Sequence, residues 1–386
     1  MRIAMIGQKG IPTSFGGIER NVEVLSTRLG RLGYEVIVYT RAWYAAPNAR
    51  FSPGVRTVAT PTIHTKHLDA ITHTLTSTFH AIFSGVDVIH YHGVGPTLLS
   101  FIPRLLAPRT KVITTFHCID RFHGKWGWFA RLMLWLGEWA CCRFPHETIV
   151  TSKTLAKYCR EKFGRETNIV YYGIEAPETE QGDEVIRRFG LKRDGYVAMV
   201  SRLVRHKGAH YLIAAYQELK KRGLTNGKKL ALVGDSAFTD EYVASLKRLA
   251  DGDPDIVFTG YLKGKALAQM FAGAYCLAHP SESEGMPIAV LEAMGYGKCV
   301  VASDIPENME AITENGLPFG DRNVADLARA LEQALANPDL VREKGAAARA
   351  YILARHGSDL MAKEVSRIYK RVAIGRPVKR ASEAKR

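Results

Sequence analysis

Short apolar runs alternate along the chain with longer stretches in which apolar residues recur every three or four positions. The runs predict buried strands, and the longer stretches predict amphipathic helices. Strands are expected at 2–6, 35–39, 86–91, 111–116, 147–152 and 168–172, and then at 196–201, 229–234, 256–259 and 275–279. Helices are expected at 18–32, 153–163, 209–222, 240–250, 267–272, from 287, and at 321–336, 340–356 and 360–372. This alternation predicts an α/β protein with parallel, doubly wound sheets.

The length of 386 residues is too great for one hydrophobic core, so two domains are expected. A connector containing glycine, proline and acidic residues begins at Gly173 and separates two strand–helix series. We expect two doubly wound domains that face each other across a cleft. The expected divisions are a first domain 1–172, a linker 173–190, a second domain 191–355, a helix 356–372 that packs back on the first domain, and a basic tail 373–386.

The stretch 277–307, LAHPSESEGMPIAVLEAMGYGKCVVASDIPE, is the most informative of the second domain. Pro287 is well suited to the first position of a helix, because proline has no N–H to lose there. The free N–H groups at such a helix start can bind a phosphate. They belong to Gly285, Met286, Ile288 and Ala289. Glu284 before the helix and Glu292 within it could accept from sugar hydroxyls, although an ordinary surface helix with two solvated glutamates is the alternative.

Two cations, Arg202 and Lys207, follow the strand expected at 196–201 across a turn. A pair of this kind can clamp a diphosphate and stabilise the charge that develops on a leaving nucleotide. In the first domain, His117 follows the strand at 111–116, on the side where ligands of open α/β sheets bind. A lone histidine can equally have a structural role.

Gly16 and Gly17 lie in a glycine-punctuated loop between the first strand and the first helix. Glycine would let the backbone approach a ligand closely, and a tight turn is the alternative. The loop does not read GxGxxG. The second strand ends in Thr40-Arg41 and lacks the acidic residue of a nicotinamide site, which argues against a dehydrogenase.

The formal net charge of +15 is compatible with nucleic acid, an anionic membrane or phosphorylated substrates as partners. Part of it lies in 371–386, where six Lys or Arg accompany one Glu. The segment 121–143 holds four of the five tryptophans and four basic residues, with Glu138 as its one acid. Such a segment is either buried between domains or docked on a bilayer surface.

No apolar run is long enough to suggest a transmembrane helix, and MRIAMIG is typical of a first strand, not of a signal peptide. The six cysteines form no CxxC, which favours reduced thiols in a cytoplasmic protein.

Taken together, these motifs resemble the retaining glycosyltransferases of family 4, which have the GT-B fold of two Rossmann-like domains. The resemblance spans nearly the whole chain, in GIPTSFGGIERNVEVLSTRL, HYHGVGP, TTFHCID, SRLVRHKG and SESEGMPIAVLEAM, the last being similar to the family's E-x7-E signature. The opening GQKGIPTSFGGIE is most similar to members that build bacterial surface polysaccharides, including rhamnosyltransferase-like ones.

The resemblance implies a role for each candidate residue. His117 would line the reaction centre, with Gly16 and Gly17 near the donor phosphates or the acceptor. Arg202 and Lys207 would bind the diphosphate, and Glu284 the hydroxyls of the donor sugar. The remaining contacts would be the backbone of Gly285, Met286, Pro287 and Ile288 with sugar and phosphate, Glu292 with the ribose, and Tyr261 with the base pocket.

The family is implied to need no metal and no cofactor, because the nucleotide-diphosphate sugar is a co-substrate. Retention would proceed by front-face attack, with the leaving phosphate helping to take the acceptor proton. The acceptor would be a glycan or a polyprenyl-diphosphate-linked sugar, and peripheral contact with an anionic membrane would follow. Asp251 and Asp253 in DGDPD resemble a metal-binding DxD, but their composition is that of a turn.

Two other readings compete. Paired glutamates could indicate a glycoside hydrolase, which would have no use for a phosphate clamp. A non-catalytic basic protein that binds membrane or nucleic acid would explain the net positive charge but would leave the motifs unexplained. Nucleic acid is not an expected partner of the transferase.

Overall fold

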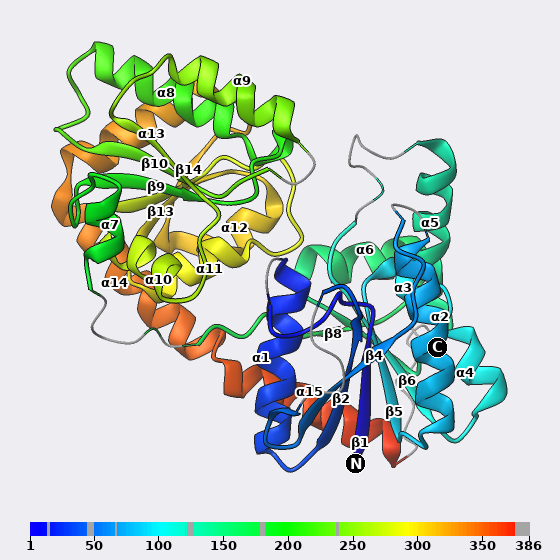
Figure 1. The fold of residues 1–386 in the computed structure, drawn as a ribbon. Coiled ribbons are helices and arrows are strands. Elements are labelled where there is room, and N and C mark those ends of the chain that lie inside the picture. Colours follow the sequence, from blue (N-terminus) through cyan, green and yellow to red (C-terminus); the bar gives the residue numbers. More distant parts are fainter. Residues whose placement is uncertain are drawn as a thin grey trace. The chain divides into compact units, whose positions relative to one another are not determined.

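The structure is a computed structural model, and it describes residues 1–13, 16–44, 50–65, 68–119, 121, 127–175, 177, 182–236 and 239–374. The chain divides into two compact units, one comprising Met1–Gly173 with Ser358–Arg386 and the other Ile174–Gly357 (Figure 1). Two segments about which the sequence made predictions lie outside the described residues. They are residues 122–126 of the tryptophan-rich segment and residues 375–386 of the basic tail.

The first unit is built on an eight-stranded sheet in the order β3-β4-β2-β1-β5-β6-β7-β8. Its strands are β1 (Arg2–Ile6), β2 (Glu35–Arg41), β3 (Arg50–Ser52), β4 (Val55–Thr60), β5 (Val88–His92), β6 (Lys111–Phe116), β7 (Glu147–Val150) and β8 (Asn168–Ile169). Neighbouring strands pair in parallel apart from the edge pair of β3 with β4. The strand order reverses between β1 and β5, which is the position where doubly wound sheets bind ligands.

Helices cover both faces of this sheet (Figure 1). They are α1 (Gly17–Arg31), α2 (Asp69–Phe83), α3 (Val94–Thr97), α4 (Phe101–Leu106), α5 (Trp128–Arg143), α6 (Lys153–Phe163) and α15 (Ser358–Ala373). Successive residues of β1 point to opposite faces, so Ile3 and Met5 enter one core while Ala4 and Ile6 enter another. The buried face of α15 belongs to the same core as α1, and Tyr369 of α15 is fully buried there.

The second unit has a six-stranded sheet in the order β11-β10-β9-β12-β13-β14, and its neighbouring strands are parallel. Its strands are β9 (Tyr196–Val200), β10 (Lys229–Val233), β11 (Ile256–Gly260), β12 (Cys276–His279), β13 (Cys299–Ser303) and β14 (Leu317–Phe319). The order reverses between β9 and β12. The loops after these two strands therefore meet at one point of the sheet edge.

The helices of the second unit also lie on both faces of its sheet (Figure 1). They are α7 (Glu184–Arg188), the 3₁₀ turn η2 (Arg205–Lys207), α8 (Ala209–Lys221), α9 (Asp240–Ala250), α10 (Gly264–Gly273), α11 (Ile288–Gly295), α12 (Pro306–Ile312), the 3₁₀ turn η3 (Thr313–Asn315), α13 (Val324–Ala336) and α14 (Pro338–Arg355). Aliphatic side chains of β9, β10, α8 and α13 form one continuous core. The predicted α/β class with two doubly wound sheets is confirmed.

Three expectations about local structure were wrong. Pro287 is not the first helical residue, because its ψ of 88° lies outside the helical region and α11 begins at Ile288. The strand expected at 86–91 begins only at Val88 and continues through His92. The strand expected at 168–172 ends at Ile169. In addition, β3, β4 and α2 occupy residues 50–83, where no element was predicted.

Candidate active site

The loops that follow β9 and β12 are held against each other by backbone contacts. The N–H of Glu282 donates to the carbonyl of His206 over 2.8 Å, and Ser281 Oγ donates to the same carbonyl over 3.3 Å. Gly208 makes this approach possible, because a Cβ at that position would lie 1.9 Å from the carbonyl oxygen of Pro280. Its φ of +75° also favours glycine. The turn at Lys207 is therefore fixed beside the loop that carries Glu284.

Lys207, Glu284 and His279 form a compact polar cluster at this junction. Lys207 Nζ lies 2.5 Å from Glu284 Oε1, and His279 Nε2 lies 2.7 Å from the same oxygen. The side chains of Lys207, Glu284 and His279 are 13%, 8% and 3% exposed. Two residues predicted to bind different parts of a donor thus already form an ion pair with each other.

The electrostatics of the cluster keep Glu284 ionised. Burial by itself would raise the pKa of Glu284, but the charge of Lys207 and the hydrogen bond and charge of His279 outweigh it, so the net pKa is lowered. A buried carboxylate held in its charged form is a ready acceptor for hydroxyl groups. Within the described residues, His279 Nδ1 is buried and has no hydrogen-bond partner.

The ends of β9, β10 and β11 converge close to the same edge. The N–H of Gly234, just after β10, donates to the carbonyl of Gly260 over 3.0 Å. A Cβ on Gly234 would lie 1.8 Å from the carbonyl oxygen of Ser201. Of the two predicted ligand residues here, Arg202 is exposed and Tyr261 is half-exposed. Their side chains are presented to solvent at the carboxyl ends of the strands.

The start of α11 offers backbone donors to a ligand. Within the described part of the chain, the N–H groups of Gly285, Met286, Ile288 and Ala289 make no hydrogen bond. The first carbonyl used by the helix is that of Pro287, which accepts from Val290 and Leu291. Met286 is buried, whereas Glu292 in the second turn is partly exposed. Unpaired N–H groups at a helix start attract anions.

The glycine-rich loop of the first unit is held by two carboxylates of α1. Glu19 Oε1 accepts from the N–H of Lys9 over 3.1 Å, and Glu23 Oε2 accepts from the N–H of Thr13 over 2.6 Å. Gly16 has a φ of +106°, and a Cβ there would lie 2.0 Å from Glu19 Oε2. The structure therefore gives an internal reason for glycine at 16, beside the predicted approach of a ligand. Gly16 and Gly17 are both exposed.

His117 lies at the end of β6 and is 2% exposed. Its Nδ1 is 2.7 Å from the hydroxyl of Tyr172, and its Nε2 is 3.3 Å from Nδ1 of His92. Both ring nitrogens are therefore engaged by neighbouring side chains. The ring of His92 stacks on that of His117 with 5.5 Å between centroids. His117 is held rigidly within the first unit.

A third histidine, His90, lies beside this pair, with its ring centroid 4.2 Å from that of His92. His90 contacts the hydroxyl of Tyr369 through Nδ1 and that of Thr115 through Nε2, each over 2.7 Å. Burial, and secondarily the charge of His117, lower the pKa of His90 to about 3. Burial likewise lowers the pKa of His92 well below its ordinary value. Both rings are neutral near pH 7.

Five residues of these clusters were missed from the sequence: His279, His92, Tyr172, Glu19 and Glu23. The end of an apolar run could have indicated His279, because β12 stops there. The other four act through contacts that no local pattern reveals. The DxD-like Asp251 and Asp253 lie in a turn after α9, where Asp253 accepts from Lys220 Nζ over 2.6 Å.

Two family models match the chain. Residues 15–176 match the model described as Glycosyltransferase Family 4, and residues 183–351 match the model described as Glycosyl transferases group 1. Together they span most of both units. These matches do not favour the alternative of a non-catalytic basic protein.

Two curated relatives are informative. An uncharacterised glycosyltransferase of Methanocaldococcus jannaschii is 25% identical over 96% of this chain and 98% of its own length. A GDP-mannose-dependent alpha-(1-6)-phosphatidylinositol monomannoside mannosyltransferase of Mycobacterium tuberculosis is 27% identical over 68% of this chain and 71% of its own.

Solved structures show the same fold. Sucrose-phosphate synthase from Thermosynechococcus elongatus has a TM-score of 0.84 at 20% identity, covering 97% of this chain and 100% of its own. Anabaena HepE in complex with UDP-glucose has a TM-score of 0.76 at 18% identity, covering 96% and 99%. With a family 4 first half, a group 1 second half and the GT-B fold, this chain belongs to the glycosyltransferases.

Proposed function

We propose that the chain is a retaining, metal-independent transferase that moves a hexosyl or deoxyhexosyl group from a nucleotide-diphosphate sugar. The acceptor is a glycan or a lipid-linked sugar of bacterial surface polysaccharide synthesis. The observation that carries this proposal is the Lys207–Glu284–His279 cluster, set at the strand-order reversal of the second unit beside the unpaired N–H groups of α11. The complex of HepE with UDP-glucose supports a donor of this class.

In the proposed site each polar group of the donor has a partner of matching chemistry. Lys207 and the exposed Arg202 bind the diphosphate, aided by the N–H groups from Gly285 to Ile288. Glu284, held ionised, accepts from hydroxyls of the sugar. Glu292 accepts from the ribose hydroxyls, and Tyr261 borders the base.

The ion pair also suggests how charge is handled during transfer. Before the donor binds, Lys207 neutralises Glu284. The diphosphate then gives the same ammonium a second anionic partner, so Lys207 can stabilise the charge that grows on the leaving phosphate. That phosphate takes the acceptor proton in front-face attack. No metal is required, because fixed cations and backbone N–H groups supply the positive potential.

The first unit contributes His117 and the glycine-rich loop. With both ring nitrogens engaged by Tyr172 and His92, His117 acts as a fixed wall of the reaction centre. The exposed Gly16 and Gly17 leave room for backbone contact with the donor phosphates or the acceptor. The two carboxylates of α1 hold the N–H groups of Lys9 and Thr13 in place before substrate arrives.

Transfer assays on the full chain test this function. Lys207→Ala and Glu284→Ala are each expected to lower sugar transfer by about a hundredfold or more, the loss typical of removing one transition-state contact. Lys220→Ala is the matched control, because it removes a lysine–carboxylate pair of the same unit outside the site. Full transfer by both site variants would contradict the proposal. The anomeric configuration of the product, read by NMR, tests retention.

We also propose that the enzyme contacts an anionic membrane through α5. No helix of the described residues is long and apolar enough to cross a bilayer. However, Trp128, Leu132, Trp135 and Trp139 are between 37% and 79% exposed along one stripe of α5. Glu138 is fully buried and accepts from Tyr158, whereas Arg131 and Arg143 are exposed. An exposed stripe of tryptophan and arginine suits a headgroup layer.

Flotation with phosphatidylcholine–phosphatidylglycerol vesicles tests the membrane contact. Trp135→Ser combined with Trp139→Ser is expected to abolish flotation. Leu353→Ser, an exposed apolar position of α14, is the control that should float like the unaltered protein. Absence of flotation by the unaltered full chain would remove the proposal and leave the donor site untouched.

A further inference from the structure

A pocket of about 420 Å³ lies on the first unit, between α15 and the residues that precede β1 and β2. It is lined by Met1, Leu32, Gly33, Tyr34, Lys363, Ser366, Arg367 and Lys370. Met1 and Tyr34 directly precede β1 and β2, so the pocket lies at the amino ends of the strands. His92 and His117 lie at the carboxyl ends. Within the first unit, the pocket and His117 therefore lie at opposite ends of the strands.

The wall formed by α15 is strongly cationic. Lys363, Arg367 and Lys370 are exposed and recur at the spacing that places side chains on one face of a helix. Within the described residues none of the three forms a salt bridge, although burial raises the pKa of Glu364 on the same helix and the charge of Arg367 partly offsets that rise. The nearby Glu35 is already paired with Arg2. Positive charge in the pocket therefore exceeds negative charge.

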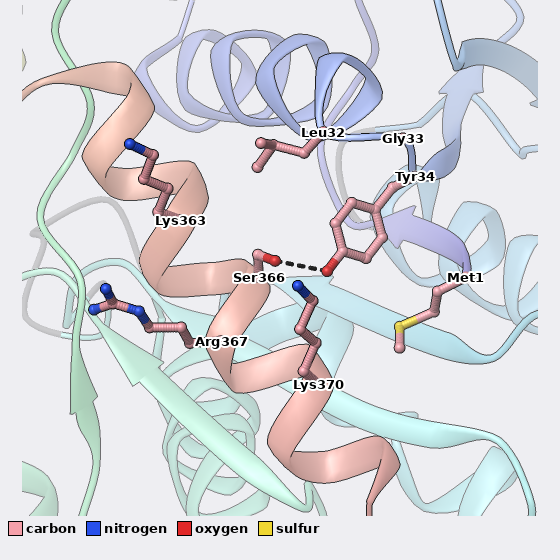
Figure 2. A pocket seen from close by; sticks show the side chains of 8 residues that line it. All are labelled: Met1, Leu32, Gly33, Tyr34, Lys363, Ser366, Arg367 and Lys370. Atoms are coloured by element: carbon pink, nitrogen blue, oxygen red, sulfur yellow. Dashed lines mark hydrogen bonds between the residues drawn. The ribbon is translucent and has the colours of Figure 1, made fainter.

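A pair of hydroxyl groups forms the inner wall of the pocket. Tyr34 and Ser366 are each 7% exposed, and their oxygens lie 2.6 Å apart. The hydrogen bond between the two hydroxyls needs the proton of only one of them. Neither hydroxyl has another hydrogen-bond partner in the described residues. The remaining O–H is available to a bound acceptor. Figure 2 shows Lys370 pointing toward this pair, with Met1 and Leu32 on either side of Tyr34.

We propose that this pocket binds a phosphate-bearing anion. Three cations together match the charge of a phosphate monoester or diphosphate better than that of a single carboxylate. A guanidinium also binds two phosphate oxygens at once, and an O–H donor can serve a third. Met1 and Leu32, 39% and 47% exposed, give an organic substituent of the phosphate an apolar surface to rest on. The volume falls in the ordinary range of small-molecule sites.

The phosphate has two possible sources, a soluble compound or a lipid headgroup, and two arms of one experiment distinguish them. In the first arm, the full chain is titrated calorimetrically with inorganic pyrophosphate. In the second, it is mixed with phosphatidylcholine vesicles that contain phosphatidic acid. Both arms compare the unaltered protein with Arg367→Gln/Lys370→Gln. The control, Arg160→Gln/Lys162→Gln, removes the same charge from exposed positions of α6.

The pocket variant is expected to weaken phosphate binding about tenfold or more in at least one arm, while the control changes it by less than about twofold. Lys207→Ala separates this site from the proposed donor site, because pocket binding should survive it. Hydrogen exchange of peptides covering 32–36 and 363–372 should slow when pyrophosphate or vesicles bind. Equal binding by the pocket and control variants in both arms, with no protection of these peptides, would overturn the proposal.

Discussion

Replacing Lys207 with methionine should destabilise the second unit through the charge that it leaves behind. The ammonium lies 2.5 Å from Glu284 Oε1, and both side chains are almost completely buried. Removing one partner of a buried ion pair typically costs 3–5 kcal/mol. His279 Nε2 remains 2.7 Å from the same carboxylate, so we expect the lower end, about 3 kcal/mol. Adding Glu284→Gln to Lys207→Met removes the unpaired carboxylate charge and should restore about 2 kcal/mol of the free energy of unfolding.

Hydrogen exchange can measure this change in the second unit alone. All five tryptophans lie at 43, 126, 128, 135 and 139, so tryptophan emission reports the first unit and serves as an internal control. A loss of about 3 kcal/mol should speed globally exchanging amides of β9 and β12 by more than about a hundredfold. The emission transition should not move.

The double variant Lys207→Met/Glu284→Gln decides whether the pair is coupled. It should exchange more slowly than Lys207→Met and yet fail to transfer sugar, because both proposed ligand contacts are gone. If Lys207→Met exchanged like the unaltered protein, or if the second substitution made exchange faster still, the pair would not be the buried, coupled unit that the structure describes.

Three further predictions concern single features. Arg202→Ala should leave unfolding unchanged, because Arg202 is exposed, but should weaken nucleoside diphosphate binding about tenfold or more in a titration. Gly16→Ala should destabilise the first unit by about 1–3 kcal/mol in urea unfolding followed by tryptophan emission, because a Cβ would strain the backbone and meet Glu19. Since the pKa of Glu284 is lowered by folding, its stabilising contribution is present above its unfolded pKa and is lost only as the pH falls through the lower folded value. Glu284 should therefore stay ionised from pH 5 to 8, and donor affinity measured over this range should show no pH-dependent step caused by this residue. A step that is present in the unaltered protein and absent in Glu284→Gln would contradict the assignment.

The elements with regular spacing could be predicted closely from the sequence. The helices at 153–163 and 240–250 and the strand at 111–116 have the predicted bounds. Residues 50–83 could not be assigned, because β4 pairs with β2 through backbone hydrogen bonds and α2 is rich in threonine and serine. Threonine and serine weaken a helical pattern, since their side chains compete for backbone groups.

Pro287 illustrates how a local preference is overridden. Proline suits the first position of a helix, yet here the loop that carries Glu284 determines the backbone, and Pro287 takes a non-helical ψ just before α11. The N–H groups expected at the helix start are unpaired nonetheless.

The candidate site was predictable as a set of residue types but not as a set of contacts. Strand ends identified the positions of Lys207 and Glu284, because ligands gather at the carboxyl ends of parallel strands. The ion pair of Lys207 with Glu284 and the contact of His279 depend on the close approach of Gly208 to Pro280. These two residues lie in the loops after β9 and β12, which are far apart in the sequence. The engagement of both His117 nitrogens depends on Tyr172, which lies 55 residues further along the chain.

A thermal-shift panel of nucleoside diphosphates tests the central claim, that the second unit holds a donor-binding site, most directly. A ligand at a hundred times its dissociation constant stabilises the folded state by about 2.7 kcal/mol. The account predicts that at least one nucleoside diphosphate raises the unfolding midpoint of the unaltered protein and of Lys220→Ala, but not of Lys207→Ala. If none raised it at millimolar concentration, or if Lys207→Ala responded as strongly as the control, the proposed donor site would be contradicted.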